Sequence, residues 1–125
     1  MAVVSALVII PSVYRFFEHT ADLGLRLEAD DLPGLLQAAG QGLTAVIVAR
    51  PQRVEPRSRT PLRLDGARAD YLLLDWLNEL LFLFETRGLV GATFEVEVSR
   101  QGLEATVLGE IFDERRHGAG REVKA

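Results

Sequence analysis

The feature that most constrains the fold is a long apolar run over residues 71–84. Only Asp75, Asn78 and Glu79 interrupt the run, and it is shorter than the ~20 apolar residues that a bilayer-spanning helix requires. Apolar side chains occupy most of the circumference of a helix drawn through it, which is typical of a helix inside a protein core. The run therefore predicts a buried helix over residues 67–87 at the centre of the fold.

This helix is expected to stop at Gly88, because glycine readily adopts the left-handed conformation that closes a helix. Its polar stripe consists of Asp75, Asn78, Glu79 and Glu85. Such a stripe either hydrogen-bonds buried backbone or lines an interface, and we favour the first interpretation. We expect the apolar residues to be buried: Tyr71, Leu72, Leu73, Trp76, Leu77, Leu80, Leu81 and Phe84.

A second, amphipathic helix is expected over residues 32–48. Asp30 and Asp31 supply carboxylates suited to a helix N-cap, and Pro33 falls in the first turn, where its missing N–H costs nothing. Apolar residues then recur at three- and four-residue steps: Leu32, Leu35, Leu36, Ala39, Leu43, Val46 and Ile47. That face is predicted to pack on a sheet.

Turn residues and period-two alternation predict the strands. Residues 13–17 and 23–28 are interpreted as strand segments separated by a break, and residues 57–64 as a short strand near a sheet edge. Residues 93–98 and 103–107 are expected to form a hairpin. The order indicates an α+β domain of strand–helix–strand–strand units, with a mixed sheet packed with two helices.

Composition limits the classes of function. Of 125 residues 48% are hydrophobic, and 14 Lys and Arg against 18 Asp and Glu give a formal net charge of −4. These values are typical of one folded domain, and the acidic balance argues against wrapping nucleic acid with a basic face. There is no cysteine. Disulfides, cysteine nucleophiles and thiolate metal sites are therefore excluded, so any metal must use oxygen or imidazole ligands.

Residues 1–10 are uncharged and apolar, with the length of a signal-peptide core. No Lys or Arg precedes them, however, and no clear small-x-small cleavage pattern follows. We favour a first strand or a few unstructured residues over a secretory signal. Residues 1–12 are accordingly interpreted as an N-terminal extension of a single domain spanning residues 13–125.

The first candidate cluster is Glu18, His19 and Asp22, at the break between the first two strand segments. Carboxylate and imidazole are the metal ligands left to a chain without cysteine, and hard cations such as Ca²⁺ or Mg²⁺ prefer carboxylate oxygens. Asp22 is the best oxygen donor. The spacing alone fits a structural turn better, because the Thr20 and Asp22 side chains can bond local backbone N–H groups.

The second cluster follows the hairpin and contains Glu110, Asp113, Glu114 and His117. If its loop lay at the same sheet end as the first cluster, several carboxylates and both histidines would converge. The alternative is a solvated charged loop in which Arg115 and Arg116 offset the acids.

Two further observations leave the type of function open. Arginines at positions 50, 53, 57 and 59 could meet phosphates, although a solvated edge is favoured because no aromatic residues interleave to stack bases. The chain lacks phosphate-binding glycine loops, the Gly-x-Ser-x-Gly elbow and the His-Glu-x-x-His motif. A metal-assisted hydrolase and a small binding module both remain open on these grounds.

Several segments, taken together and in the same order, resemble the archease family. They are EHTADLG (18–24), WLNELLFLFET (76–86), GE (109–110), DERRH (113–117) and EVKA (122–125). The resemblance covers about residues 14–125. It implies a small cytoplasmic protein that does not join RNA itself, but promotes guanylylation and repeated turnover of an RtcB-type RNA ligase in tRNA splicing and RNA repair.

The resemblance also implies the site. The metal-ligating aspartate of the family maps to Asp22. We expect an acidic surface around Glu18, Asp22 and Asp113 to dock near the ligase active site, and we predict Glu18, His19, Asp113 and His117 as partner-binding residues. No direct sequence-specific contact with nucleic acid and no membrane contact is implied.

One departure from the family affects the metal. Archease chains normally continue past Val-Lys-Ala with a strand hairpin that carries another acidic ligand and a carbonyl of the same site. Because the sequence stops at Glu122-Val123-Lys124-Ala125, we expect that hairpin to be missing here. We therefore expect Ca²⁺ or Mg²⁺ to bind more weakly, because hard-cation sites gain affinity with ligand number and charge. An exposed sheet edge is also expected to permit self-association.

Overall fold

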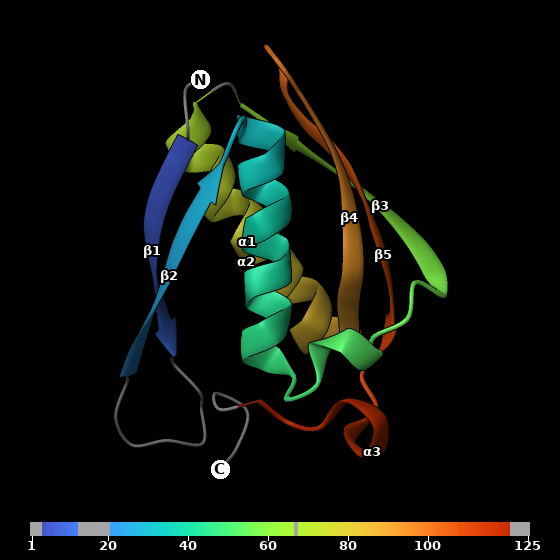
Figure 1. The fold of residues 1–125 in the computed structure, drawn as a ribbon. Coiled ribbons are helices and arrows are strands. Elements are labelled where there is room, and N and C mark those ends of the chain that lie inside the picture. Colours follow the sequence, from blue (N-terminus) through green and yellow to red (C-terminus); the bar gives the residue numbers. More distant parts are fainter. Residues whose placement is uncertain (1–3, 13–20, 67, 121–125) are drawn as a thin grey trace.

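The computed structural model describes residues 4–12, 21–66 and 68–120, with side chains described from Leu27 onward. The elements run in the following order: β1 (Val4–Ser12), β2 (Ala21–Ala29), α1 (Leu32–Ile47), the short 3₁₀ helix η1 (Pro51–Arg53), β3 (Ser58–Asp65), α2 (Ala69–Arg87), β4 (Leu89–Ser99), β5 (Gly102–Ile111) and α3 (Glu114–His117). The two long helices lie between a β1–β2 pair and a sheet of β3, β4 and β5 (Figure 1). The α+β class is confirmed.

The strands pair differently from the single mixed sheet that was expected. Every described pair is antiparallel: β1 with β2, and β5 with both β3 and β4, in the order β3-β5-β4. The connections between the strands explain this arrangement. A short turn joins β4 to β5, so these two strands are antiparallel. The chain passes from β3 through α2 to β4, but β3 pairs with β5 and not with β4. The result is two antiparallel sheets on opposite sides of the helices.

Residues at the N-terminal end of the chain form a strand. β1 lies antiparallel to β2 with Val4 opposite Ala29 and Ser12 opposite Ala21. Of the two interpretations favoured for residues 1–10, the structure has the strand at Val4–Ser12. The strand predicted over residues 13–17 lies outside the described residues. The boundary between an extension and the domain therefore stays a prediction.

Helix α1 begins and packs as predicted. The Asp31 side chain accepts a hydrogen bond of 2.8 Å from the Gly34 N–H at the N-terminus. The face that contacts β4 and α2 buries apolar residues throughout its length: Leu35, Leu36, Ala39, Leu43 and Ile47. The predicted edge strand and hairpin are also confirmed as β3 and as β4 with β5.

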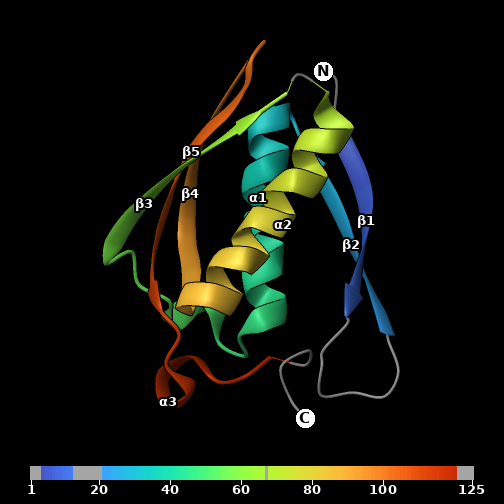
Figure 2. The same cartoon turned by 180° about the vertical axis from the view of Figure 1, so that it is seen from behind.

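Helix α2 supplies the centre of the core through Trp76. Its side chain is fully buried, its indole N–H donates to the Leu36 carbonyl at 2.7 Å, and its ring meets Phe94 edge-on with centroids 5.8 Å apart. The helix ends at Gly88, whose φ of 70° is left-handed as expected. Seen from behind, α2 crosses in front of α1 between the two sheets (Figure 2).

The opposite face of α2 corrects two expectations. Tyr71 was expected in the core but is 57% exposed, and Leu74 and Phe82 on the same face are also largely exposed. Asp75 and Asn78 are exposed too, so the prediction that they bond buried backbone is wrong. The reason is that α1 and the larger sheet cover only one side of this helix. None of the described helices is both long and apolar enough to cross a membrane.

Candidate functional site

The candidate site is built where β5 ends. Asp113 caps α3, its carboxylate accepting a 3.0 Å hydrogen bond from the Arg115 N–H. After α3 the chain returns to the end of α1, where the Gly118 carbonyl accepts from the Ala49 N–H and the Ile47 carbonyl accepts from the Gly120 N–H. We call this region the α3 corner; it comprises Glu55, Arg57, Glu110, Asp113, Arg116 and His117.

Glu110 is the centre of the α3 corner. Its side chain is only 7% exposed, and its carboxylate accepts hydrogen bonds from four donors. The Arg116 guanidinium donates to both carboxylate oxygens, from Nη1 to Oε1 at 2.7 Å and from Nη2 to Oε2 at 2.9 Å. The Glu55 backbone N–H donates to Oε2 at 2.7 Å. Arg57 approaches Oε1 at 3.4 Å. This buried charge is therefore paired and saturated, as a buried carboxylate must be to remain ionised.

His117 completes the network from inside the fold. It has no exposed surface, and its Nδ1 accepts a 2.9 Å hydrogen bond from the Asp113 backbone N–H. Because a backbone N–H can only donate, Nδ1 carries no proton. The proton is on Nε2, which donates to Glu110 Oε2 at 3.0 Å. His117 is thus a neutral imidazole that ties α3 to β5.

The arginine segment supports the same corner. Arg50 donates from Nε to the Arg116 carbonyl and from Nη2 to the Arg115 carbonyl, at 3.0 and 3.1 Å, and so satisfies the carbonyls of α3. Arg57 pairs with Glu55, and Arg59 pairs with Glu95. The favoured interpretation of a solvated edge fits these exposed pairs, whereas Arg50 is half-buried and structural.

An open hollow of about 690 Å³ lies over the corner. Residues of the η1–β3 connection form one side, and residues from the end of β5 through α3 form the other. Asp113 lines it, and so does Ile111, which is 59% exposed. The hollow thus combines a carboxylate, guanidinium groups and an apolar side chain, a mixture suited to contact with another protein.

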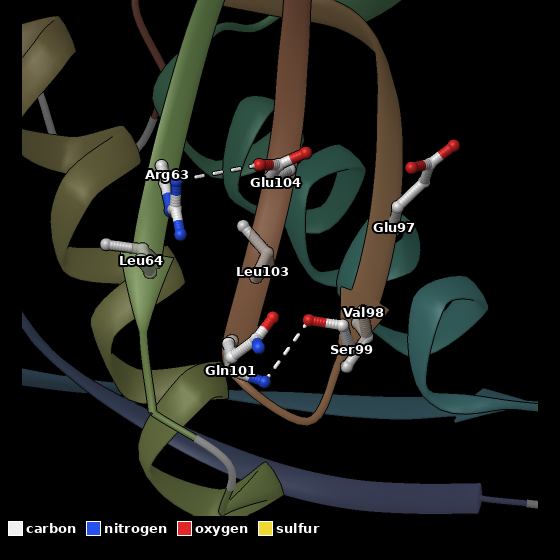
Figure 3. Close-up of a pocket in the computed structure, with 9 residues that line it drawn as sticks. Arg63, Leu64, Glu97, Val98, Ser99, Gln101, Leu103 and Glu104 are labelled. Carbon is white, nitrogen blue, oxygen red and sulfur yellow. Dashed lines mark hydrogen bonds and ion pairs between the residues drawn. The ribbon is translucent and has the colours of Figure 1, made fainter.

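A smaller hollow lies on the outer face of the larger sheet near the β4–β5 turn (Figure 3). Its volume is about 120 Å³. Glu104 faces Glu97 across the strands, and Arg63 approaches Glu104 at 3.9 Å. Such exposed pairs contribute little to stability or binding. This hollow has no buried polar group of the kind that holds the α3 corner together.

The α3 corner gives a pH dependence to stability. Hydrogen bonds from Arg116 lower the pKa of Glu110 from 4.5 to about 2, although burial opposes the shift. The unfolded chain therefore binds a proton at this group that the folded chain does not. The stabilisation is fully present above pH 4.5 and is lost as the pH falls from about 4.5 to about 2.

Urea unfolding at successive pH values measures this effect. The difference in free energy of unfolding between the wild type and Glu110→Gln should shrink as the pH falls through this window. A constant difference would contradict the assignment.

The structure places the predicted site residues unequally. Glu18 and His19 lie outside the described residues. Asp22 is the second residue of β2, with its backbone opposite Pro11, and its side chain is not among those described. The start of β2 lies at the same end of the molecule as α3 (Figures 1 and 2). The backbone of Asp22 and the α3 corner thus lie at one end of the fold, and the convergence of the two clusters stays a prediction.

The second cluster does not behave as one acidic group. Asp113 and Glu114 are exposed, whereas Glu110 and His117 are buried. Both ring nitrogens of His117 form hydrogen bonds inside the fold, so this residue holds α3 in place and has no exposed surface. Its role in partner binding remains a prediction. Sequence reasoning missed Arg116 as the partner of Glu110, treating it only as a compensating surface charge. The sequence signal that could have predicted this ion pair was the short spacing of Glu110, Asp113 and Arg116 within one turn-forming segment.

The described residues do not fit a metal ion at this corner. The oxygens of Glu110 are occupied by donors, and Asp113 accepts from its own helix. No group of three His, Asp or Glu side chains suited to a metal occurs in the part of the chain whose side chains the structure describes. The expectation of a metal therefore rests on Asp22 alone, and it stays a prediction.

Comparison with known proteins decides the family. The model of the archease protein family matches residues 14–125. The chain belongs to the archease family. An archease of Pyrobaculum calidifontis is 36% identical over 121 residues, which cover 92% of this chain and 81% of that protein. An archease of Pyrococcus furiosus is 33% identical over 116 residues, covering 90% and 81%. Membership of the archease family supports a role as an accessory protein in RNA processing.

Proposed function

We propose that this protein activates an RtcB-type RNA ligase in tRNA splicing and RNA repair in the cytoplasm, promoting ligase guanylylation and repeated turnover without catalysing the reaction itself. Membership of the archease family is the observation that carries the proposal. The finer role follows from the resemblance of the segments around Asp22, Trp76 and Asp113. The domain acts by docking on the ligase.

The α3 corner supports docking because it is rigid. Glu110 joins β5 to the η1–β3 connection and to α3 through one carboxylate, so the hollow above it keeps its shape. Preorganised surfaces bind with a smaller entropy cost. Asp113 and Ile111 are the exposed groups that the corner offers to a partner. Glu18, His19 and Asp22 are proposed to extend this surface from the start of β2.

Activation is proposed to be conformational. A partner shifts an equilibrium only through different affinities for the two states. The docked domain therefore binds more tightly to the ligase conformation that accepts GTP, and its acidic residues contact groups exposed only in that conformation. Asp22 is proposed as the residue that also holds a divalent cation, Ca²⁺ or Mg²⁺.

The test uses ligase–GMP formation with GTP and cleaved RNA. Asp22→Ala is expected to reduce the stimulation of ligase guanylylation at least about tenfold while the domain stays folded. Ile111→Asp is expected to weaken ligase binding, because it places a charge in the hollow. Asp65→Ala is the control, since Asp65 is 87% exposed and pairs with Gly102 at the distant β4–β5 turn. Normal stimulation by both test variants would reject the proposal.

An assay without the ligase distinguishes an accessory protein from the alternative, a metal-dependent phosphoester hydrolase. That alternative requires the isolated chain to cleave phosphoesters with Mg²⁺ or Mn²⁺ and no ligase present. An accessory protein instead shows no turnover alone and stimulates the ligase when mixed with it.

A further inference from the structure

Helix α3 is too short to be stable by itself. It spans Glu114–His117, and an isolated helix needs several turns before its hydrogen bonds outweigh the loss of chain entropy. Two backbone hydrogen bonds close it. The His117 N–H donates to the Asp113 carbonyl at 2.8 Å, and the Gly118 N–H donates to the Glu114 carbonyl at 2.9 Å. Contacts from elsewhere in the chain must therefore keep α3 folded.

Arg50 supplies such contacts at the C-terminal end of α3. It lies between α1 and η1, at the end of the molecule where α3 is found (Figure 1). The last carbonyls of a helix have no partner within the helix. Here Nη2 of Arg50 donates to the Arg115 carbonyl at 3.1 Å, and Nε donates to the Arg116 carbonyl at 3.0 Å. The Arg50 backbone N–H donates to the His117 carbonyl at 2.8 Å. One residue thus caps three consecutive carbonyls of this helix.

Gly118 leaves room for the Arg50 guanidinium. The φ of Gly118 is 71°, in the left-handed region that favours glycine. A Cβ atom at this position would lie 3.1 Å from Nη1 and 3.1 Å from Nη2 of Arg50, closer than ordinary van der Waals contact. Two positions far apart in the sequence are therefore adapted to the same contact.

This contact bears on the proposed docking surface because α3 carries part of that surface. Asp113, which caps the other end of α3, is exposed and lines the hollow over the α3 corner. Glu110 holds α3 through the side chains of Arg116 and His117. Arg50 instead binds the backbone of α3, so it acts directly on the helical conformation.

We propose that Arg50 is a positioning residue: by capping α3 from the α1–η1 connection, it fixes the orientation in which Asp113 meets the ligase. The inference rests on the proposed function, because it names a residue that acts on the same docking surface. Arg50 is not among the residues that line the hollow, so it acts through α3. Without this cap, docking would have to order α3 as well, which lowers affinity.

Amide hydrogen exchange of the free protein gives the first test. In Arg50→Ala the N–H groups of His117 and Gly118 are expected to exchange at least about tenfold faster, because α3 unfolds in a large share of molecules. Arg50→Lys should give an intermediate rate, since an ammonium keeps the charge but lacks the planar fork of donors. Arg53→Ala is the matched control, because its side chain is exposed and its backbone carbonyl, which accepts from Arg116, is retained. Unchanged exchange in Arg50→Ala would overturn the proposal.

Ligase guanylylation at increasing concentrations of the domain gives the second test. Arg50→Ala is expected to raise the half-saturating concentration at least about threefold and to leave maximal stimulation unchanged, because the docked domain has α3 in place. Val107→Ala is the control for lost stability alone. Val107 is 1% exposed on β5, and its truncation weakens the core without removing a contact of Arg50.

Two results would overturn the proposal. One is a half-saturating concentration that Arg50→Ala leaves unchanged, and the other is an equal rise with Val107→Ala. A wild type that stimulates no ligase would reject the proposed function and with it the docking role of Arg50. The exchange measurement would still show whether Arg50 holds α3, so the two failures are distinguishable.

Discussion

Glu110→Ala is expected to lower the free energy of unfolding by about 3–5 kcal/mol, the largest effect expected of any charged residue whose side chain the structure describes. The substitution leaves the Arg116 guanidinium without its buried counter-ion. It also removes the acceptor of the His117 Nε2–H and of the Glu55 N–H. Buried donors without acceptors cost far more than a surface ion pair contributes.

Urea unfolding followed by circular dichroism measures this effect. Glu104→Ala is the matched control, because Glu104 lies on the same strand but is 69% exposed and reaches Arg63 only at 3.9 Å. Its substitution is expected to change stability by less than about 0.5 kcal/mol. If the two variants unfolded at the same urea concentration, Glu110 would not hold the α3 corner together.

Trp76→Ala is expected to cost about 3–5 kcal/mol as well, through a different mechanism. The indole is fully buried between the helices and the larger sheet, where it meets Phe94. Its removal leaves a cavity lined by side chains that cannot collapse completely. It also removes the hydrogen bond that joins α2 to the Leu36 carbonyl of α1.

Trp76→Phe separates these contributions. It retains an aromatic ring but removes the indole N–H and part of the volume, so a loss of about 1–2 kcal/mol is expected. Because Trp76 is the only tryptophan, unfolding must be followed by circular dichroism rather than by tryptophan fluorescence. Similar stability of Trp76→Ala and the wild type would show that this side chain does not anchor the two helices.

The elements of the fold were largely predictable because their signals are local. Pro33 and Asp31 mark the start of α1, Gly88 marks the end of α2, and the alternation on both sides of Gly102 marks the β4–β5 hairpin. Each of these depends on residues a few positions apart. The pairing of β3 with β5 was not predictable in this way, because its partners lie from 37 positions apart (Asp65 and Gly102) to 51 positions apart (Ser58 and Gly109).

The candidate site was harder to predict for the same reason. The sequence indicated that Glu110, Asp113 and His117 belong to one segment, and it favoured a solvated loop. It could not indicate that the backbone of Glu55 reaches the Glu110 carboxylate and that Arg50 reaches the carbonyls of α3. With those contacts in place the side chains of Glu110 and His117 are buried, whereas that of Asp113 is exposed.

The sequence by itself determined the α+β class, both long helices, the hairpin and the resemblance to the archease family. These properties follow from backbone preferences, the periodicity of apolar residues and short motifs, all of which are contained in neighbouring residues. The tertiary structure alone decided which acids are buried, which arginines are structural and which side of α2 faces water. Burial and ion pairing depend on what packs against a residue, and distant parts of the chain supply those contacts.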